Sequence, residues 1–385
     1  MFKIAAYAIM KNEADNIFAF VDQFKGHVDK LVLLDTGSED NTVDLARDLE
    51  QAHDFIQVIT AEFRPFSFSS ARNMALEYAS KELSEGDLVI WLDLDERLED
   101  GWYSKLMKIV IDNQLHQRGC PFVFKTNMIF SERNGVPTME YLQSKIHTVG
   151  THQWQYDCHE ILVQTGTRAS CETVFSGINV RHFPNRNKER NYLPLLLNDY
   201  KKRPYDLRAL HYLAREYAYQ EDWKTVASLL GNIGMCKHQV TPAGLIDAYL
   251  LEVEASIALG NDYLQTLYKA LSIIPNHAEV LLALSYYYHG KQDYLASIHW
   301  TQVAIKSLSD STNPYQNVIY NKQNEIAWQL YDIAAHSFSE LGNYQQALSY
   351  YGILYQEFNK LLDDDTSQRV KNNLLWLAEQ VNHDT

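Results

Sequence analysis

The feature that most constrains the fold is a change of pattern near residue 205 of this 385-residue chain. Before that point, short apolar runs alternate with amphipathic stretches; after it, the pattern is helical throughout. Strands that alternate with helices of this length predict parallel βαβ units. A chain of this length also exceeds what one hydrophobic core normally supports. The sequence therefore predicts two domains of different architecture.

The first part shows a regular alternation up to about residue 92. Strands are expected at residues 4–10, 30–34, 55–60 and 87–92, and helices at residues 16–24, 42–50 and 70–83. The pattern then changes, and short β-like pieces mixed with polar loops are expected at residues 122–125, 160–163 and 177–180. Ligands of open α/β sheets bind beyond the carboxyl ends of the strands. The polar clusters of this chain follow those ends.

A weak repeat marks the second part. The turns before Trp223, Tyr294 and Tyr344 occupy the same position between two amphipathic helices, and small residues such as Ser297 and Ala347 follow them. The offsets predict tetratricopeptide-like repeats of roughly 34 residues, in about four copies of which some are degenerate. An irregular helical bundle is the alternative.

Composition excludes some partners. The net charge of -15 argues against a general affinity for nucleic acid or anionic membranes, which both require a basic face, although it permits one basic phosphate pocket. No stretch approaches the roughly 20 apolar residues of a membrane span. The apolar N-terminus lacks the marks of a signal peptide, and the four cysteines show no CxxC spacing. We expect a cytoplasmic protein with free thiols.

Two carboxylates follow the fourth expected strand. Asp93 and Asp95 are separated by one residue, so both leave the strand on the same side. That geometry suits Mn²⁺ or Mg²⁺ bound to a diphosphate, because such cations take few protein ligands and keep several waters. Solvated surface carboxylates are the alternative.

Polar residues also follow the first two strands. Asn12 and Glu13 come after the first strand, and Asp35, Gly37 and Ser38 come after the second. An acid at a strand tip can accept hydrogen bonds from a ribose or a base, and glycine permits a tight turn. Capping of the next helix is the alternative role of Ser38.

Four segments carry a family resemblance. In this order and spacing, NEADNI, LLDTGSEDNT, FSFSSARNMALEYA and VIWLDLDERL resemble family 2 glycosyltransferases of GT-A fold. The DTGS form and the FS.ARN.AL pattern are similar to the subgroup with C-terminal tetratricopeptide repeats, whose relatives include S-glycosyltransferases of bacteriocin peptides. The resemblance implies an α/β GT-A (nucleotide-diphospho-sugar transferase) domain followed by an all-α tetratricopeptide-like helical repeat domain. The expected boundaries are 1–184 for the GT-A domain, 185–204 for a basic linker helix and 205–385 for the repeats.

The resemblance implies nucleotide-sugar binding by the strand-end residues. Asn12 and Glu13 would lie near the base. Asp35 would contact the nucleoside, while Gly37 and Ser38 shape the turn around it.

The resemblance also implies a place for the diphosphate and its cation. Asp93 and Asp95 stand where the family's DxD motif binds metal and ribose-diphosphate, and His182 would complete the metal shell. Arg72 would be a cation near the diphosphate, because a guanidinium pairs bidentately with phosphate oxygens. A structural histidine and a surface arginine are the alternatives.

The candidate general base lies in a Cys-His-Glu segment. The repeat-bearing subgroup shows a His-Glu pair there, so Glu160 is the first candidate and His159 the second. A structural salt bridge from Glu160 to Arg168 or Arg181 is the alternative.

Nearby aromatic, histidine and cysteine residues carry further alternatives. Trp154 and Tyr156 either form a platform for a sugar ring or belong to the core. A zinc site is not expected, because five residues follow no familiar zinc spacing: His147, His152, Cys158, His159 and Cys171.

Together these features predict a metal-dependent, inverting transfer of sugar from a nucleoside-diphosphate sugar, expected to be a UDP-sugar. The acceptor would be a peptide, protein or glycan bound on the repeat domain. The alternative is an inactive repeat scaffold that binds nucleotide-sugar and partner proteins. A nucleotidyltransferase would have a Gly-rich, basic first loop, and residues 9–16 contain no glycine and one lysine. Repeat arrays often mediate pairing, so homo-oligomerisation stays open.

Overall fold

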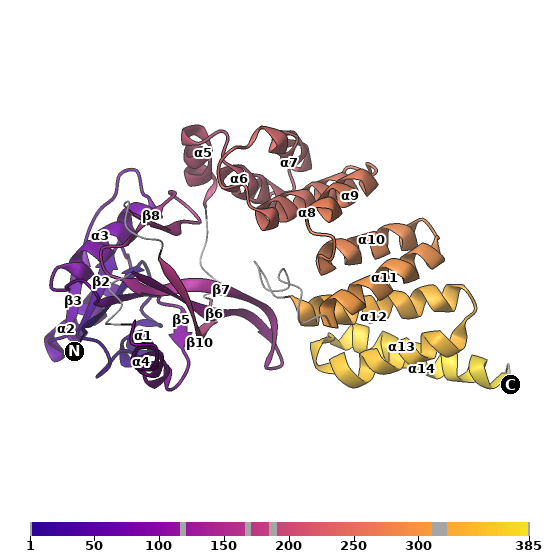
Figure 1. Ribbon diagram of the computed structural model, residues 1–385, viewed down its shortest axis with the longest axis horizontal. Helices are drawn as coiled ribbons and strands as arrows, with labels where there is room; N and C mark the ends of the chain where they lie inside the picture. The colour runs from indigo at the N-terminus through magenta and orange to yellow at the C-terminus, as the bar shows by residue number, and fades with distance from the viewer. Residues whose placement is uncertain (1, 116–120, 166–170, 185–190, 310–321, 384–385) are drawn as a thin grey trace. The chain divides into compact units, whose positions relative to one another are not determined.

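The computed structural model describes residues 2–115, 121–165, 171–184, 191–309 and 322–383. Its contacts divide the chain into two units, namely Met1–Ile129 with Leu142–Lys202, and Phe130–Tyr141 with Arg203–Thr385. The first contains most of a sheet with helices, and the second contains an array of helices together with residues 130–141 of the sheet (Figure 1). This confirms the predicted fold class, an α/β domain of GT-A type followed by an all-α repeat domain. Among the described residues, no helix is long and apolar enough to span a membrane.

The sheet-forming part of the chain follows the predicted alternation in its first half. Its elements are β1 (Ile4–Met10), α1 (Ile17–Asp22), β2 (Lys30–Asp35), α2 (Thr42–Ala52), β3 (Ile56–Thr60), α3 (Phe68–Ser80), β4 (Leu88–Trp91), β5 (Glu96–Leu98), α4 (Trp102–Asp112), β6 (Phe122–Arg133), β7 (Val136–Thr148), β8 (His152–Gln155), β9 (Ile161–Gln164), β10 (Glu172–His182) and α5 (Leu193–Lys202).

In the described residues, eight strands form one sheet in the order β3-β2-β1-β4-β7-β6-β10-β5. The pairs β1–β2, β2–β3 and β1–β4 are parallel, which confirms the predicted βαβ units. Beyond β4 the sheet is mixed, because β7 pairs with β4 in antiparallel orientation. The expected short pieces at 122–125 and 177–180 are therefore wrong in length: they belong to the long strands β6 and β10.

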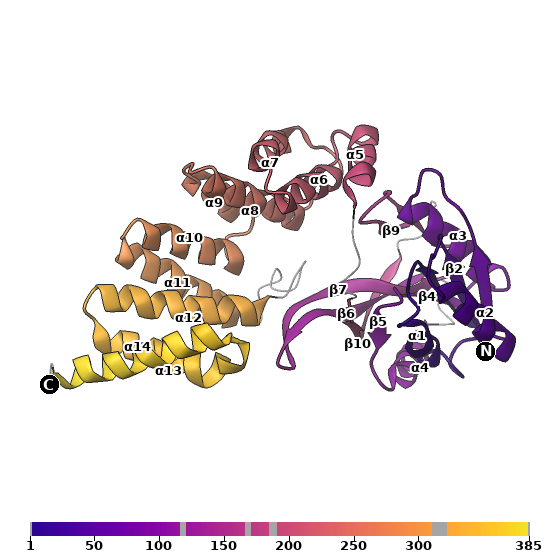
Figure 2. The same cartoon turned by 180° about the vertical axis from the view of Figure 1, so that it is seen from behind.

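The two faces of the sheet are covered by different helices. Ala71 and Ala75 of α3 pack against Tyr7 of β1, and their small side chains let the helix approach the sheet closely. Ser67 caps α3 by accepting a hydrogen bond from the Ser70 backbone N–H. Figures 1 and 2 show α1 and α4 together on the opposite face. This arrangement fixes β1 and β4, whose ends carry the candidate site.

The second unit is built from antiparallel helix pairs. Its helices are α6 (Leu207–Tyr219), α7 (Trp223–Leu230), α8 (Pro242–Ala258), α9 (Leu264–Ile273), α10 (Ala278–Gly290), α11 (Tyr294–Ser309), α12 (Gln323–Glu340), α13 (Tyr344–Phe358) and α14 (Asp364–His383). The views agree that α10 to α14 lie side by side (Figures 1 and 2). The predicted small residues Ser297 and Ala347 are fully buried between these helices, and so is Ala304.

The turns within four helix pairs contain the same backbone hydrogen bond. A residue just before the second helix donates its backbone N–H to the carbonyl five residues earlier, at Asp222, Asn261, Asp293 and Asn343, over 2.8–3.0 Å. The residue before each donor has a positive φ of 58° to 72°. This is the hydrogen bond of a Schellman helix end. The turns predicted from sequence are confirmed, although only the first two of their three intervals lie near the expected period of roughly 34 residues.

The region expected to be a basic linker helix, residues 185–204, contains the helix α5. α5 ends at Lys202 and groups with the first unit. Residues 185–190, which carry Arg186, Lys188 and Arg190, lie outside the described residues. The boundaries at 184 and 204 stay predictions. Cys158, Cys171 and Cys236 are free thiols, and Cys120 lies outside the described residues.

Candidate active site

The polar loops after β1 and β2 are hydrogen-bonded to each other. Met10 pairs with Asp35 at the carboxyl ends of the two strands. The Asn12 backbone N–H donates to Ser38 Oγ at 2.9 Å, and the Asn12 side-chain oxygen accepts from the Glu39 N–H at 2.7 Å. Asn12 adopts a φ of 54°, in the left-handed region. Two predicted binding residues from different loops thus meet at one edge of the sheet.

Asp35 organises the turn after β2. Its buried carboxylate accepts hydrogen bonds from the Gly37 N–H at 2.9 Å and from Ser38 Oγ at 2.5 Å. Gly37 has a φ of 106°, which favours glycine. The capping role considered for Ser38 is wrong, because its hydroxyl bonds to Asn12 and Asp35 and not to an N–H of α2. The loop after β1 is joined to the start of α2, because the Glu13 N–H donates to Thr42 Oγ1 at 2.7 Å.

Arg72 joins the end of β4 to the segment before β9. Its Nη2 donates to Asp93 Oδ1 at 2.6 Å, and its Nε donates to Glu160 Oε1 at 2.5 Å. Only 5% of Arg72 is exposed, so the surface-arginine alternative is wrong. Its guanidinium carbon lies 5.0 Å from the ring centroids of both Trp91 and Trp154, a cation–π geometry.

The salt bridge of Glu160 therefore differs from the alternative considered from sequence. Its described partner is Arg72, on α3, rather than Arg181. Arg168 lies outside the described residues. The predicted base, the predicted phosphate cation and the first acid of the Asp-x-Asp pair are brought together at one point.

The charges at this point alter each other's pKa values. Burial acts to raise the pKa of Asp93, but the positive charges of Arg72 and Lys145 outweigh it and the pKa is lowered. Burial acts to lower the pKa of Arg72, and the charges of Asp93 and Glu160 outweigh it, so this pKa is raised. Asp93 and Arg72 are thus ionised throughout the neutral range.

A second buried ion pair lies beside the first. Lys145 of β7 is fully buried and donates from Nζ to both oxygens of Glu96, at 2.6 and 2.8 Å. The same Nζ lies 3.4 Å from the centroid of the Trp91 ring. Burial is the main cause that raises the pKa of Glu96 and lowers that of Lys145. Glu96 Oε2 also accepts the Asp93 backbone N–H at 2.9 Å, so the pair fixes the start of the acidic loop.

Asp95 lies beside the predicted late histidine. The distance from Asp95 Oδ2 to His182 Nε2 is 3.3 Å, and both side chains are largely buried. The pairing of β10 with β5, with His182 opposite Glu96, brings the histidine to this place. Among the described residues, no three His, Cys, Asp or Glu side chains are grouped to hold a metal ion. A carboxylate and an imidazole nonetheless fit a partial shell for Mn²⁺ better than for Mg²⁺, which prefers oxygen ligands; the other ligands would be water and phosphate oxygens.

The segment before β9 carries unusual backbone angles. Tyr156 and His159 have φ values of 77° and 49°, which non-glycine residues adopt rarely. Tyr156 and Trp154 are each 4% exposed, so both belong to the core and the sugar-platform alternative is wrong. Trp154 Nε1 donates to Tyr7 at 2.9 Å. His159, the second candidate base, packs against Tyr192.

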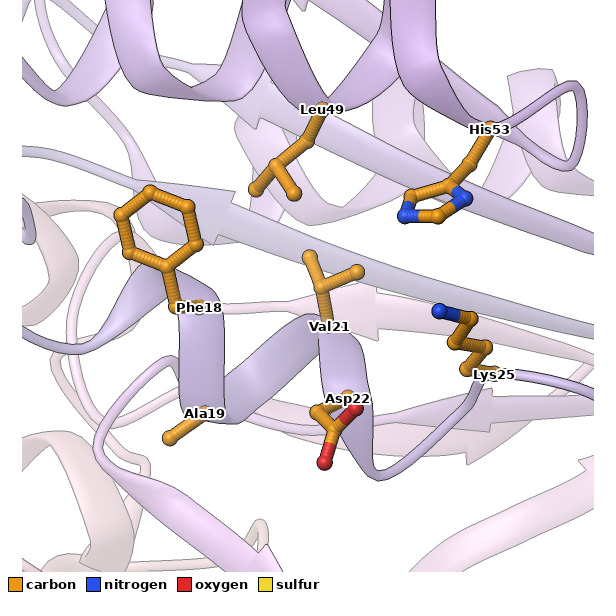
Figure 3. A pocket seen from close by; sticks show the side chains of 7 residues that line it. All are labelled: Phe18, Ala19, Val21, Asp22, Lys25, Leu49 and His53. Carbon is orange, nitrogen blue, oxygen red and sulfur yellow. The ribbon is translucent and has the colours of Figure 1, made fainter.

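A pocket of about 380 Å³ lies elsewhere in the first unit, between α1 and α2 (Figure 3). Phe18, Val21 and Leu49 form its apolar wall, and Lys25 and His53 lie at one end. None of the residues predicted from sequence lines it. The strand ends, and not this pocket, gather the candidate site.

Sequence reasoning missed Lys145 and Tyr7 as parts of this site. Lys145 stands in an unpredicted strand, and its partner Glu96 is 49 residues away. Tyr7 reads as an ordinary core residue of β1 and contacts Trp154 over 147 residues. The one local sign of this role was the position of Lys145 directly before Ile146–Thr148, the buried end of the strand.

One family model matches part of the chain. Residues 8–162 match the model of "Glycosyl transferase family 2", a range that contains every predicted site residue except His182. No curated protein matches the chain.

Solved structures resemble only part of the chain. A tetratricopeptide-repeat protein of Thermus thermophilus, TTC0263, is 21% identical, with a TM-score of 0.35 over 48% of this chain and 89% of that one. MamA AMB-1 is 13% identical, with a TM-score of 0.33 over 45% and 88%. Pseudomonas aeruginosa pilF is 13% identical, with a TM-score of 0.32 over 46% and 69%. These low likenesses transfer no function to this chain. The family match supports, in general terms, a glycosyltransferase domain over residues 8–162.

Proposed function

We propose that the chain transfers a sugar from a nucleoside-diphosphate sugar, specifically a UDP-sugar, to an acceptor with inversion at the anomeric carbon. One observation carries the proposal: Arg72 holds Asp93, at the end of β4, and Glu160, the candidate base, on one guanidinium. Both carboxylates lie in the region that matches the glycosyltransferase family. The two carboxylates, both bound to Arg72, would then act at the leaving diphosphate and at the attacking nucleophile of a displacement reaction.

Each side chain has a role in that displacement. Glu160 accepts the proton of the acceptor nucleophile as the new bond to the anomeric carbon forms. The bond from that carbon to the diphosphate oxygen breaks on the opposite face of the sugar. A divalent cation held by Asp95 and His182, with Asp93 alongside, would supply electrostatic stabilisation of the leaving diphosphate. Arg72 keeps Glu160 and Asp93 at fixed positions, which reduces the cost of reaching the reactive geometry.

The acceptor is proposed to bind along the second unit. Repeated helix pairs form extended surfaces that bind peptides and proteins. The resemblance of the DTGS and FS.ARN.AL segments to the subgroup that includes bacteriocin S-glycosyltransferases supports a peptide acceptor over a protein or glycan.

The test is release of UDP from UDP-glucose and UDP-N-acetylglucosamine, with Mn²⁺ or Mg²⁺ present. The wild-type chain should release UDP, and Asp95→Ala should reduce the rate by roughly 10²-fold or more, because a preorganised electrostatic contact is lost. Asp112→Ala on α4 is the matched control, since its exposed carboxylate pairs only with Lys108 in the described structure. Circular dichroism should be unchanged in both variants.

Two outcomes would contradict the proposal. Full activity in Asp95→Ala would remove the cation role. Absence of UDP release together with retained UDP binding would favour the inactive scaffold.

A further inference from the structure

The segment that carries the candidate base is fastened to a helix whose role the sequence left open. α5 follows the sheet and was expected to be a linker. Asp199 on this helix is 1% exposed. Its Oδ2 accepts the backbone N–H of Asp157 at 2.7 Å and that of Cys158 at 3.1 Å. One buried carboxylate therefore holds two successive amides, two and three residues before Glu160.

The side chain of Asp157 also binds α5. The Asp157 carboxylate accepts from Asn198 Nδ2 at 2.6 Å and from Lys202 Nζ at 2.7 Å, both on α5. Burial acts to raise the pKa of Asp157, but hydrogen bonds from Lys202 and Ser67 outweigh it, so this pKa is lowered. Asp157 therefore stays ionised and bound to α5 at neutral pH.

The start of α3 closes the other side. The Phe68 N–H donates to the Asp157 carbonyl at 3.0 Å. The Tyr192 ring, just before α5, lies edge-on to both Phe68 and His159. α3 also carries Arg72, the residue that grips Glu160. The segment is thus fixed between the helix that orients Glu160 and the helix that holds its backbone.

The cost of this arrangement indicates that it serves a purpose. Tyr156 and His159, on either side of the held amides, adopt left-handed backbone angles. Such angles cost of order 1–3 kcal/mol each and persist only where the surroundings determine them. Two left-handed residues enclose the two amides that Asp199 binds, so the clamp and the strained backbone belong to one feature.

We infer that Asp199 is a positioning residue that sets the place of Glu160 by fixing the backbone of residues 157 and 158. The inference rests on the proposed function, since Glu160 needs a place only if it acts on substrate. Asp199 touches no reacting atom and acts through the segment alone. Geometry of this kind matters because a misplacement of about 1 Å can lower a rate by about 10²-fold.

The test compares two aspartates with the same structural task. Asp87 is also buried and accepts two backbone N–H groups, from Lys3 and from Ser84, each at 2.7 Å. It precedes β4, at the end of the strand away from Asp93. Asp199→Ala and Asp87→Ala should therefore lower the unfolding temperature by similar amounts. Only Asp199→Ala should lower kcat for UDP release, by roughly 30- to 100-fold, with the donor KM changed less than about twofold.

Conservative and surface variants keep the test decisive if Asp199→Ala folds poorly. Asp199→Asn retains an oxygen acceptor, so kcat should stay within about fivefold of the wild type. Lys202→Ala removes a half-exposed contact to Asp157 and should lower kcat about threefold without unfolding the chain. Equal kcat in the wild type and in folded Asp199→Ala would overturn the inference, and so would an equal loss in Asp87→Ala.

Amide hydrogen exchange separates this inference from the proposed function. The N–H groups of residues 157 and 158 should be protected in the wild type and should exchange at least tenfold faster in Asp199→Ala. Unchanged protection would overturn the clamp even if UDP is released. Conversely, faster exchange in Asp199→Ala together with no UDP release from the wild type would support the clamp and contradict the proposed function.

Discussion

The two units use charge in different ways. In the first, Arg72, Glu96 and Lys145 are almost entirely buried and form ion pairs at one end of the sheet. In the second, the bidentate pair of Arg369 with Asp332 is partly exposed, and the architecture rests on repeated turns. Desolvating a charge costs several kcal/mol. The first unit therefore gives up stability to fix charges at one end of its sheet, whereas local hydrogen bonds set the repeated turns of the second.

The largest expected effect separates the units by activity. Glu160→Gln should lower kcat for sugar transfer to the acceptor roughly 10²- to 10⁴-fold, because the proton acceptor is lost while an oxygen remains for Arg72. Glu340→Gln, at the exposed end of α12, is the matched change in the second unit and should leave kcat within about twofold. Steady-state kinetics with an acceptor measures both. Similar rates for Glu160→Gln and the wild type would exclude Glu160 as the base.

The next effect compares a buried ion pair with an exposed one. Lys145→Met leaves Glu96 buried without its partner and should cost about 3–5 kcal/mol in the free energy of unfolding. Arg369→Met should cost about 1 kcal/mol or less, because water can solvate Asp332. Urea denaturation gives both values. Equal costs would show that the contrast between the units is wrong.

A smaller effect concerns how the free energy of unfolding changes with pH. Burial, followed by the charge of Glu279, raises the pKa of Asp247 on α8 to about 7, against the opposing charges of Lys322 and Arg215. The native state then binds more protons than the unfolded state from about pH 4 to pH 7, so the contribution of Asp247 to stability falls as pH rises through this window. Asp93 has a lowered pKa, so its contribution has the opposite sign and is lost as pH falls.

The variant that checks this is Asp247→Asn. It should raise the free energy of unfolding at pH 8 by about 1–3 kcal/mol and have little effect at pH 4. Urea denaturation at the two pH values, followed by a probe in the second unit, measures the difference. A gain of the same size at both pH values would point to packing and not to protonation.

The smallest effect tests the repeated turns. Gly342 has a φ of 72° and open space around its Cα, so Gly342→Ala should cost about 1 kcal/mol through backbone strain alone. Gln292 has a φ of 62° at the matching position, so Gln292→Gly should be neutral or stabilise by up to about 1 kcal/mol. The unfolding temperature should therefore fall in Gly342→Ala and should stay the same or rise in Gln292→Gly. A shift in the same direction would mean that the two turns are not equivalent.

The same contrast explains what the sequence could predict. The turns before Trp223, Tyr294 and Tyr344 are local, because each hydrogen bond spans five residues. The four parallel strands and their polar ends were likewise predicted from the alternation of apolar runs and amphipathic stretches. The contact of Arg72 with Glu160 spans 88 residues and depends on where α3 lies on the sheet. No local pattern encodes such a pairing.

The middle of the sheet escaped prediction for a related reason. β7 is half-buried over most of its length, and residues such as Glu140 and Gln143 obscure its alternation. Part of its burial is supplied by β4, which lies more than 40 residues earlier in the sequence. The role of Lys145 became visible only when that strand was in place.

The central claim is that the end of β4 binds a diphosphate through a cation. A crystal structure with Mn²⁺ and UDP, with anomalous scattering measured for manganese, tests it most directly. The account predicts a manganese peak within about 2.2 Å of a carboxylate oxygen of Asp95 and of a diphosphate oxygen. A nucleotide bound elsewhere, such as in the pocket between α1 and α2, with Asp93 and Asp95 far from any phosphate, would contradict it.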